Sequence, residues 1–154
     1  MNAPAPLKPR SKSKIQQKPV IEAIGRLLIP FILMFALYVQ FHGDFGPGGG
    51  FQAGVIFAAG LVLYGMIFGP DLLSGIITPR MVEVLLASGV LLYGGVGVAS
   101  LLLGGNFLDY NVLDSHDPHH GQHLGILLVE AGVGITVAAA VLAVYFSFTG
   151  YERR

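Results

Sequence analysis

Glu130 has the clearest potential for ion chemistry in this sequence. It interrupts an apolar run that extends from Leu124 to Phe148, seven positions beyond His123. If this run is a helix in a membrane, Glu130 lies on the order of 10 Å inside the hydrocarbon layer. A charge at that depth is costly, so the side chain must face protein or water. Its carboxylate can carry a proton, offer oxygen atoms to a sodium ion, or form a structural hydrogen bond to a neighbouring helix.

A glycine cluster between two apolar runs is the second candidate. Residues 47–54 read Pro-Gly-Gly-Gly-Phe-Gln-Ala-Gly. Three consecutive glycines cost much chain entropy and the preceding proline fixes one φ angle, so a tight and reproducible backbone path is expected. The loop could line an ion path with backbone groups or permit close packing against another subunit, and we favour packing, with the phenylalanine as the side chain that seats the loop. The candidate residues are Pro47, Gly48, Gly49, Gly50 and Phe51.

The third candidate is a segment rich in histidine and aspartate, residues 114–123. His119 and His123 would share one helix face at i,i+4 spacing, which suits zinc. No ordered position for a third ligand is evident, and the absence of Cys excludes thiolate sites. The segment can equally collect protons or cations near an entrance, or simply be solvated. We expect no metal or other cofactor, and we keep His123 as an ion-path candidate.

Neither enzyme chemistry nor a nucleic-acid partner is predicted. The glycine cluster lacks the Lys-Ser/Thr pair of a phosphate-binding loop, and no catalytic nucleophile arrangement appears. Glu83 is a weaker ion-path candidate, because it follows Arg80 by three residues and can form an ordinary i,i+3 pair near the membrane surface.

The composition indicates a membrane protein. With 53% hydrophobic and 12% charged residues, a soluble chain of 154 residues would have too little polar surface. Runs of about 20 apolar residues, the length that crosses about 30 Å of hydrocarbon, occur four times. We therefore predict an all-α integral membrane fold with four transmembrane helices, at about residues 20–41, 51–68, 81–103 and 124–148.

The charge distribution predicts the orientation. Every Lys and Arg falls on one side of the four-span arrangement, so both termini should be cytoplasmic. The opposite loops carry no Lys or Arg but several acidic residues, of which Asp44 in the glycine loop could attract cations. The domain boundaries that follow are a disordered cytoplasmic tail (1–19), a membrane domain (20–148) and a cytoplasmic C-terminal end (149–154).

Two stretches resemble a known family. Residues 42–54, with the glycine cluster at their end, and residues 125–137, with Glu130 near the middle, are similar to the B subunit of multisubunit Mrp-type (Mnh-type) sodium/proton antiporters. The resemblance covers about residues 20–148, and the two motifs occur in the family's order. One departure is the spacing from His42 to Pro47, which is longer than the family's usual His-x-x-Pro.

The resemblance implies a small subunit that works only within a complex that exchanges Na⁺, or another monovalent cation, for H⁺ across a prokaryotic plasma membrane. The implied partners, besides the lipid bilayer, are the large A and D subunits, to which the proton channels are attributed, and the small C, E, F and G subunits. The chain would then contribute to assembly or to the sodium path. Two alternatives remain: a purely structural assembly subunit of a related ion-translocating or hydrogenase-type complex, and a metal-responsive membrane protein that uses the histidine-rich segment.

Overall fold

The computed structural model describes residues 19–43, 49–114 and 116–150, and within them all regular structure is helical. This confirms the all-α fold class. The expected tail, residues 1–19, lies outside the described residues except for Pro19, and so do residues 151–154. The elements in chain order are α1 (Pro19–His42), α2 (Gly50–Phe68), α3 (Pro70–Ile76), α4 (Pro79–Leu102), the 3-10 helix η2 (Tyr110–Leu113) and α5 (Pro118–Phe148).

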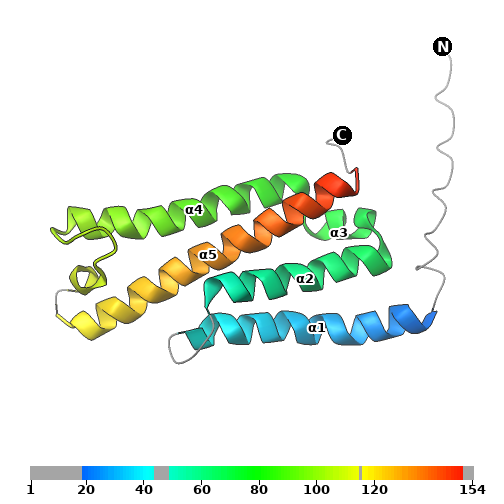
Figure 1. Ribbon diagram of the computed structural model, residues 1–154, viewed down its shortest axis with the longest axis horizontal. Helices are drawn as coiled ribbons and strands as arrows, with labels where there is room; N and C mark the ends of the chain where they lie inside the picture. Colours follow the sequence, from blue (N-terminus) through cyan, green and yellow to red (C-terminus); the bar gives the residue numbers. More distant parts are fainter. Residues whose placement is uncertain (1–18, 44–48, 115, 151–154) are drawn as a thin grey trace, which may run out of the picture.

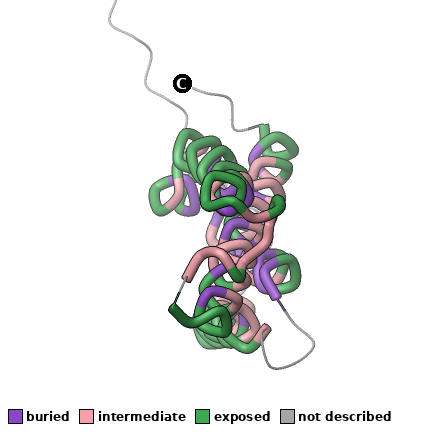
Figure 2. The backbone as a smooth tube through the Cα atoms, turned by 90° about the vertical axis from the view of Figure 1, so that its left-hand side faces the viewer, coloured by how far each residue is buried: buried purple, intermediate pink, exposed green. Residues whose placement is uncertain are grey.

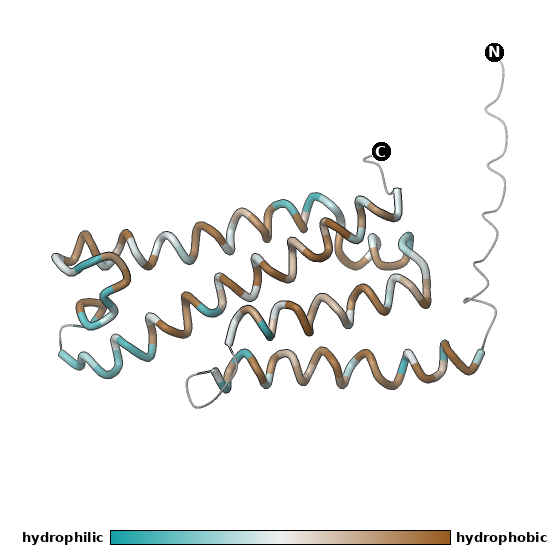
Figure 3. Tube along the Cα trace, viewed as in Figure 1, coloured by the Kyte–Doolittle hydropathy of each residue, from teal (hydrophilic) through white to brown (hydrophobic). Residues whose placement is uncertain are grey.

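Four of these helices, α1, α2, α4 and α5, are long and apolar enough to cross a membrane, as predicted. Figure 3 shows that hydrophobic residues dominate their middle stretches, whereas hydrophilic residues gather around η2 and the start of α5. The chain is therefore a multi-pass membrane protein.

The four long helices form one layer in which α1 packs on α2, α2 on α5, and α5 on α4 (Figure 1). In addition, α1 meets α5 over a small area. Buried positions lie where helices face each other, and the outer sides of the helices are exposed (Figure 2). In a membrane, these outer sides are available to lipid or to helices of other subunits.

The short helix α3 occupies most of the connection between α2 and α4, which lies between two of the predicted spans. Pro70 stands in its first turn, where the missing N–H has no consequence, and Ser74 Oγ donates a hydrogen bond to the carbonyl oxygen of Asp71 at 2.8 Å. Leu73 is fully buried and anchors α3 to the core. That core cluster consists of Leu61, Leu73, Val82, Ala139, Leu142 and Phe146.

Helix α5 begins at Pro118, six residues before the expected span. Asp117 caps it by accepting hydrogen bonds from the backbone N–H groups of His119 at 2.9 Å and His120 at 3.3 Å. With 31 residues, α5 is longer than a bilayer requires. Its first turns extend past the ends of α1 and α2, so the end of α1 and the start of α2 lie beside the middle of α5 (Figure 1).

Candidate functional site

Glu130 lies in the middle of α5, where it meets the end of α1 and the start of α2. It follows Pro118 by twelve residues, roughly 18 Å along the helix. Its carboxylate packs against Gly43, next to the end of α1, and against Gly49, the N-cap residue of α2. A Cβ atom added to Gly49 would lie 2.9 Å from Oε1 of Glu130, and one added to Gly43 would overlap Oε2. Two glycines therefore form walls of the space that holds the carboxylate.

Beside this carboxylate, α2 and α5 touch backbone to backbone. A Cβ atom added to Gly50 would overlap the carbonyl oxygen of Glu130, and one added to Gly54 would lie 2.5 Å from the carbonyl oxygen of Gly134. Such small residues let membrane helices approach closely. Gly49 needs to be glycine for its conformation as well, because its φ of 124° is one that side chains rarely adopt.

The position of the carboxylate at a helix terminus has an electrostatic consequence. The first N–H groups of α2 have no acceptor within their own helix, Gly49 offers no side-chain cap, and the helix N-terminus carries a partial positive charge. Negative charge is stabilised at such a terminus. Glu130 is partly rather than fully buried. The arrangement can therefore hold a proton on the carboxyl group, or a cation next to it, and exchange either one.

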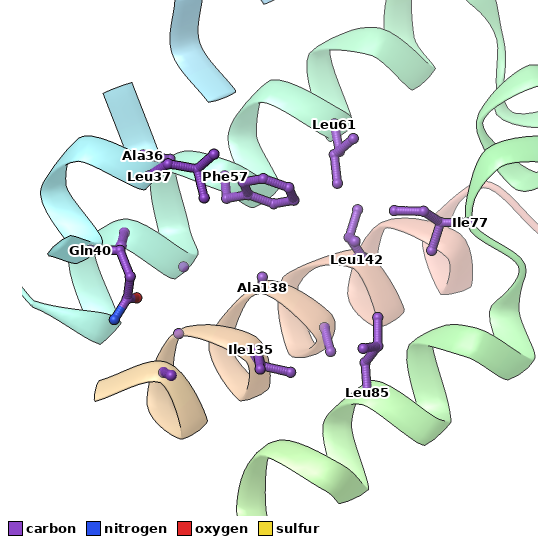
Figure 4. A pocket seen from close by; sticks show the side chains of 15 residues that line it. Ala36, Leu37, Gln40, Phe57, Leu61, Ile77, Leu85, Ile135, Ala138 and Leu142 are labelled. Carbon is purple, nitrogen blue, oxygen red and sulfur yellow. The ribbon is translucent and has the colours of Figure 1, made fainter. Parts of the chain in front are cut away.

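Gln40 extends the polar region one helical turn further. It precedes Gly43 by one turn of α1, and a Cβ atom added to Gly134 would lie 2.6 Å from its Oε1. Its Nε2 is buried and has no hydrogen-bond partner among the described residues. Gln40 also lines a cavity of about 300 Å³, and the other lining residues, from α1, α2, α4, α5 and the residue after α3, are apolar or glycine (Figure 4).

The histidine-rich segment forms a hydrogen-bonded cap on the far end of α5. The side chain of Asp114 contacts Nδ1 of His120 at 2.8 Å and accepts hydrogen bonds from the backbone N–H groups of His116 at 2.9 Å and Asp117 at 3.2 Å. These interactions, the one with His120 above all, hold the pKa of Asp114 below its ordinary value. Within this segment, Asp117 caps the start of α5, and Asp114 stabilises the turn that precedes the helix.

This segment does not assemble a metal site in the part of the chain that the structure describes. No three His, Asp or Glu side chains gather there as a metal ion would require. His119 and His123 are exposed on the first turns of α5, and His123 stands about 10 Å along the helix from Glu130. The described residues of this segment therefore do not support the metal-responsive alternative. His123 is separate from the Glu130 site.

The remaining candidates lie elsewhere or outside the described residues. Glu83 is exposed in the first turns of α4, at the opposite end of the layer from η2. Asp44, Pro47 and Gly48 belong to residues 44–48, which are not among the described ones. These predictions therefore stay predictions.

Phe51 is 63% exposed within this chain. The expectation that its side chain seats the glycine loop against another subunit therefore stays a prediction. The exposure follows from helical geometry: Gly50 and Gly54 occupy the side of α2 that faces α5, so the residue next to Gly50 points away from α5. Backbone contacts of glycine, rather than a phenylalanine plug, hold the start of α2 in place within this chain.

Three residues of the site escaped the sequence analysis as functional candidates: Gln40, Gly43 and Gly134. Gln40 interrupts an apolar run just as Glu130 does, and this signal could have identified it. The two glycines carried no such signal, because glycine is common in membrane helices and their partners are distant in sequence.

Comparison with known proteins matches residues 20–143 to a family described as "Domain related to MnhB subunit of Na+/H+ antiporter". A protein of Staphylococcus haemolyticus (strain JCSC1435) is 26% identical over 134 residues, which cover 85% of this chain and 94% of the relative. A protein of Staphylococcus aureus (strain Newman) is 28% identical over the same shares of both chains. Both relatives carry the name "Putative antiporter subunit mnhB2".

Proposed function

This chain belongs to the family of domains related to the MnhB subunit of Na⁺/H⁺ antiporters, and from that premise we propose that it is a small membrane subunit of a multisubunit antiporter. The complex exchanges Na⁺, or another monovalent cation, for H⁺ across the membrane. The chain is then a component of a secondary transporter and not an enzyme.

Within this function, Glu130 binds and releases the transported ion. The observation that carries the proposal is the enclosure of its carboxylate by Gly43 and Gly49 at the N-terminus of α2. An ionisable side chain in a membrane span is costly and by default marks an ion or proton pathway. The neighbouring glycines leave space beside the carboxylate and expose backbone groups, which is the chemistry that a small cation or a proton requires.

The same chain contributes to assembly. A single layer of four spans leaves large apolar side chains exposed on both faces, and in the complex the large A and D subunits and the small C, E, F and G subunits cover part of them. The complex resides in a prokaryotic cell membrane. Both termini of this chain face the cytoplasm, so the Glu130 site is reached from outside.

The competing function is purely structural, with Glu130 as a packing and hydrogen-bonding group only. The backbone contacts through Gly50 and Gly54 would serve this role equally well. Ion binding requires Glu130 to gain and lose a proton during transport, whereas a purely structural function does not.

Glu130→Gln in the assembled complex separates the two functions, because it keeps the shape of the side chain but removes titration. We expect Na⁺/H⁺ exchange in everted membrane vesicles to fall roughly 100-fold, as for loss of a proton-transferring group, while co-purification of the other subunits is unchanged. The matched control is Glu22→Gln in the first turn of α1, where the carboxylate contacts Arg26 at 3.8 Å, and this variant should exchange far better than Glu130→Gln. Normal exchange by Glu130→Gln across the pH range would exclude ion binding by Glu130 and favour the purely structural function.

A further inference from the structure

Gln40 carries a buried polar atom that the fold leaves without a partner. Its Nε2 finds no acceptor among the described residues, although the atom is inaccessible to solvent. An unpaired amide donor is costly in any interior, and more so in a membrane, where water cannot replace the lost hydrogen bond. A donor of this kind indicates an acceptor that reaches it in another state of the working protein.

The geometry identifies Glu130 as that acceptor. The side chain of Glu130 packs against Gly43. One turn further along α5, the side chain of Gln40 packs against Gly134. The two long polar side chains therefore lie one turn apart on the same line of contact between α1 and α5. Gly50 touches both turns, because a Cβ atom on it would overlap the carbonyl oxygen of Glu130, and its own carbonyl oxygen would lie 3.1 Å from a Cβ atom on Gly134.

We propose that Gln40 is a positioning residue for Glu130, whose carboxylate accepts a hydrogen bond from Nε2 of Gln40, directly or through one water molecule. Glu130 then has two positions, one between Gly43 and Gly49 and a second one turn deeper beside Gln40. This inference rests on the proposed function, because the second position matters only if Glu130 binds the transported ion.

The cavity next to Gln40 provides space for the Glu130 side chain in its second position, and its apolar lining limits how far the polar region extends. Its volume of about 300 Å³ accommodates movement of a glutamate side chain or entry of a water molecule. Beyond Gln40 the lining is apolar, with Phe57, Leu61 and Leu142 among its side chains (Figure 4). An ion cannot remain solvated there. Gln40 therefore marks the inner end of the polar region around Glu130 within the described residues, and the ion does not continue along this cavity.

Gln40→Met tests the proposal in the purified complex, because methionine has similar length and volume but no N–H donor. Infrared difference spectra between Na⁺-bound and Na⁺-free complex report the carboxyl band of Glu130, which is assigned by its loss in Glu130→Gln. Because the protonated carboxyl group also accepts the hydrogen bond through its carbonyl oxygen, we expect Gln40→Met to move the C=O stretch of protonated Glu130 in the Na⁺-free complex to higher wavenumber. We also expect the Na⁺ concentration that half-protects Glu130 from carbodiimide labelling to rise about tenfold, as for loss of a charge-assisted hydrogen bond.

Gln52→Met is the matched control, because Gln52 is an exposed glutamine near the start of α2, and it should leave both readouts unchanged. If Gln40→Met prevents assembly, Gln40→Asn is used as the test variant instead. Its shorter side chain should shift both readouts in the same direction to a smaller extent. The inference is overturned if the Gln40 variants match the wild type while Na⁺ still protects Glu130. If Na⁺ fails to protect Glu130 even in the wild type, the proposed function itself fails, and this inference with it.

Discussion

A carboxylate can lie beside the ends of α1 and α2 only where neighbouring side chains are absent. Glu130 and the glycines around it are complementary in this sense: Gly43 and Gly49 leave room for its two oxygen atoms, and Gly50 lets its backbone come close. Gly49 and Gly50 are therefore packing residues between α2 and α5 and also neighbours of the Glu130 side chain. A role in packing and the proposed role beside a bound ion do not exclude each other at these two residues.

Gly49→Ala tests this at the scale of one residue. The φ of 124° strains any side chain, and the new Cβ atom would lie 2.9 Å from Oε1 of Glu130. We expect a loss of about 1–2 kcal/mol in stability, seen as a lower unfolding temperature of the complex, together with reduced exchange because the carboxylate must move.

Gly95→Ala is the matched control for this change. Gly95 lies in α4, and a Cβ atom added to it meets nothing within 4 Å. Because alanine favours helix over glycine by up to about 1 kcal/mol, this variant should be neutral or more stable. Equal behaviour of the two variants would contradict the account of Gly49.

At the scale of elements, the length and capping of α5 decide where the site lies. Asp117 caps the helix that begins at Pro118, so α5 passes the ends of α1 and α2, and Glu130, near the middle of α5, lies against Gly43 and Gly49. Asp114 and Asp117 also explain the acidic composition of residues 114–123. Asp117 accepts hydrogen bonds from the first N–H groups of α5, which a helix start leaves unpaired, and Asp114 accepts from backbone N–H groups of the turn before the helix.

The role of Asp114 in this turn predicts a pH dependence of stability. Hydrogen bonds from His120 and the backbone hold its pKa in the folded chain below the ordinary value of 3.8, so the unfolded chain binds more protons near that pH. Its contribution is therefore fully present above the ordinary pKa and lost as the pH falls through the folded pKa. Unfolding temperatures of wild type and Asp114→Asn, measured across pH, should differ above about pH 5 and converge in stronger acid. A difference that grows in acid would contradict this assignment, and high salt should reduce the effect.

At the scale of the whole molecule, one layer of four spans has two faces and two edges that need lipid or protein. Figure 2 shows exposed positions on these outer sides, and large apolar residues are among the exposed ones, such as Phe51 at 63% exposure. Such a layer is suited to be a wall between larger subunits. Its orientation in the membrane then decides which solution reaches Glu130.

Cysteine labelling tests that orientation, and the chain suits it because it has no Cys of its own. His116→Cys, before α5, and Thr149→Cys, after it, both stand at exposed positions. With cytoplasmic termini, an impermeant thiol reagent added to intact cells should label His116→Cys and spare Thr149→Cys until the membrane is opened. The reverse pattern would place Glu130 within reach of the cytoplasm instead.

The class of protein and its spans followed from the amino-acid sequence, because transfer of a segment into lipid depends on its own length and composition, which are local properties. The sequence also singled out Glu130, since an ionisable group in an apolar run is visible without a fold. The tertiary structure alone decided that Glu130 meets Gly43 and Gly49, more than 80 positions away, and that Phe51 points outward. Those facts depend on how α2 and α5 pack, and contacts between helices far apart in sequence have no local signature in either one.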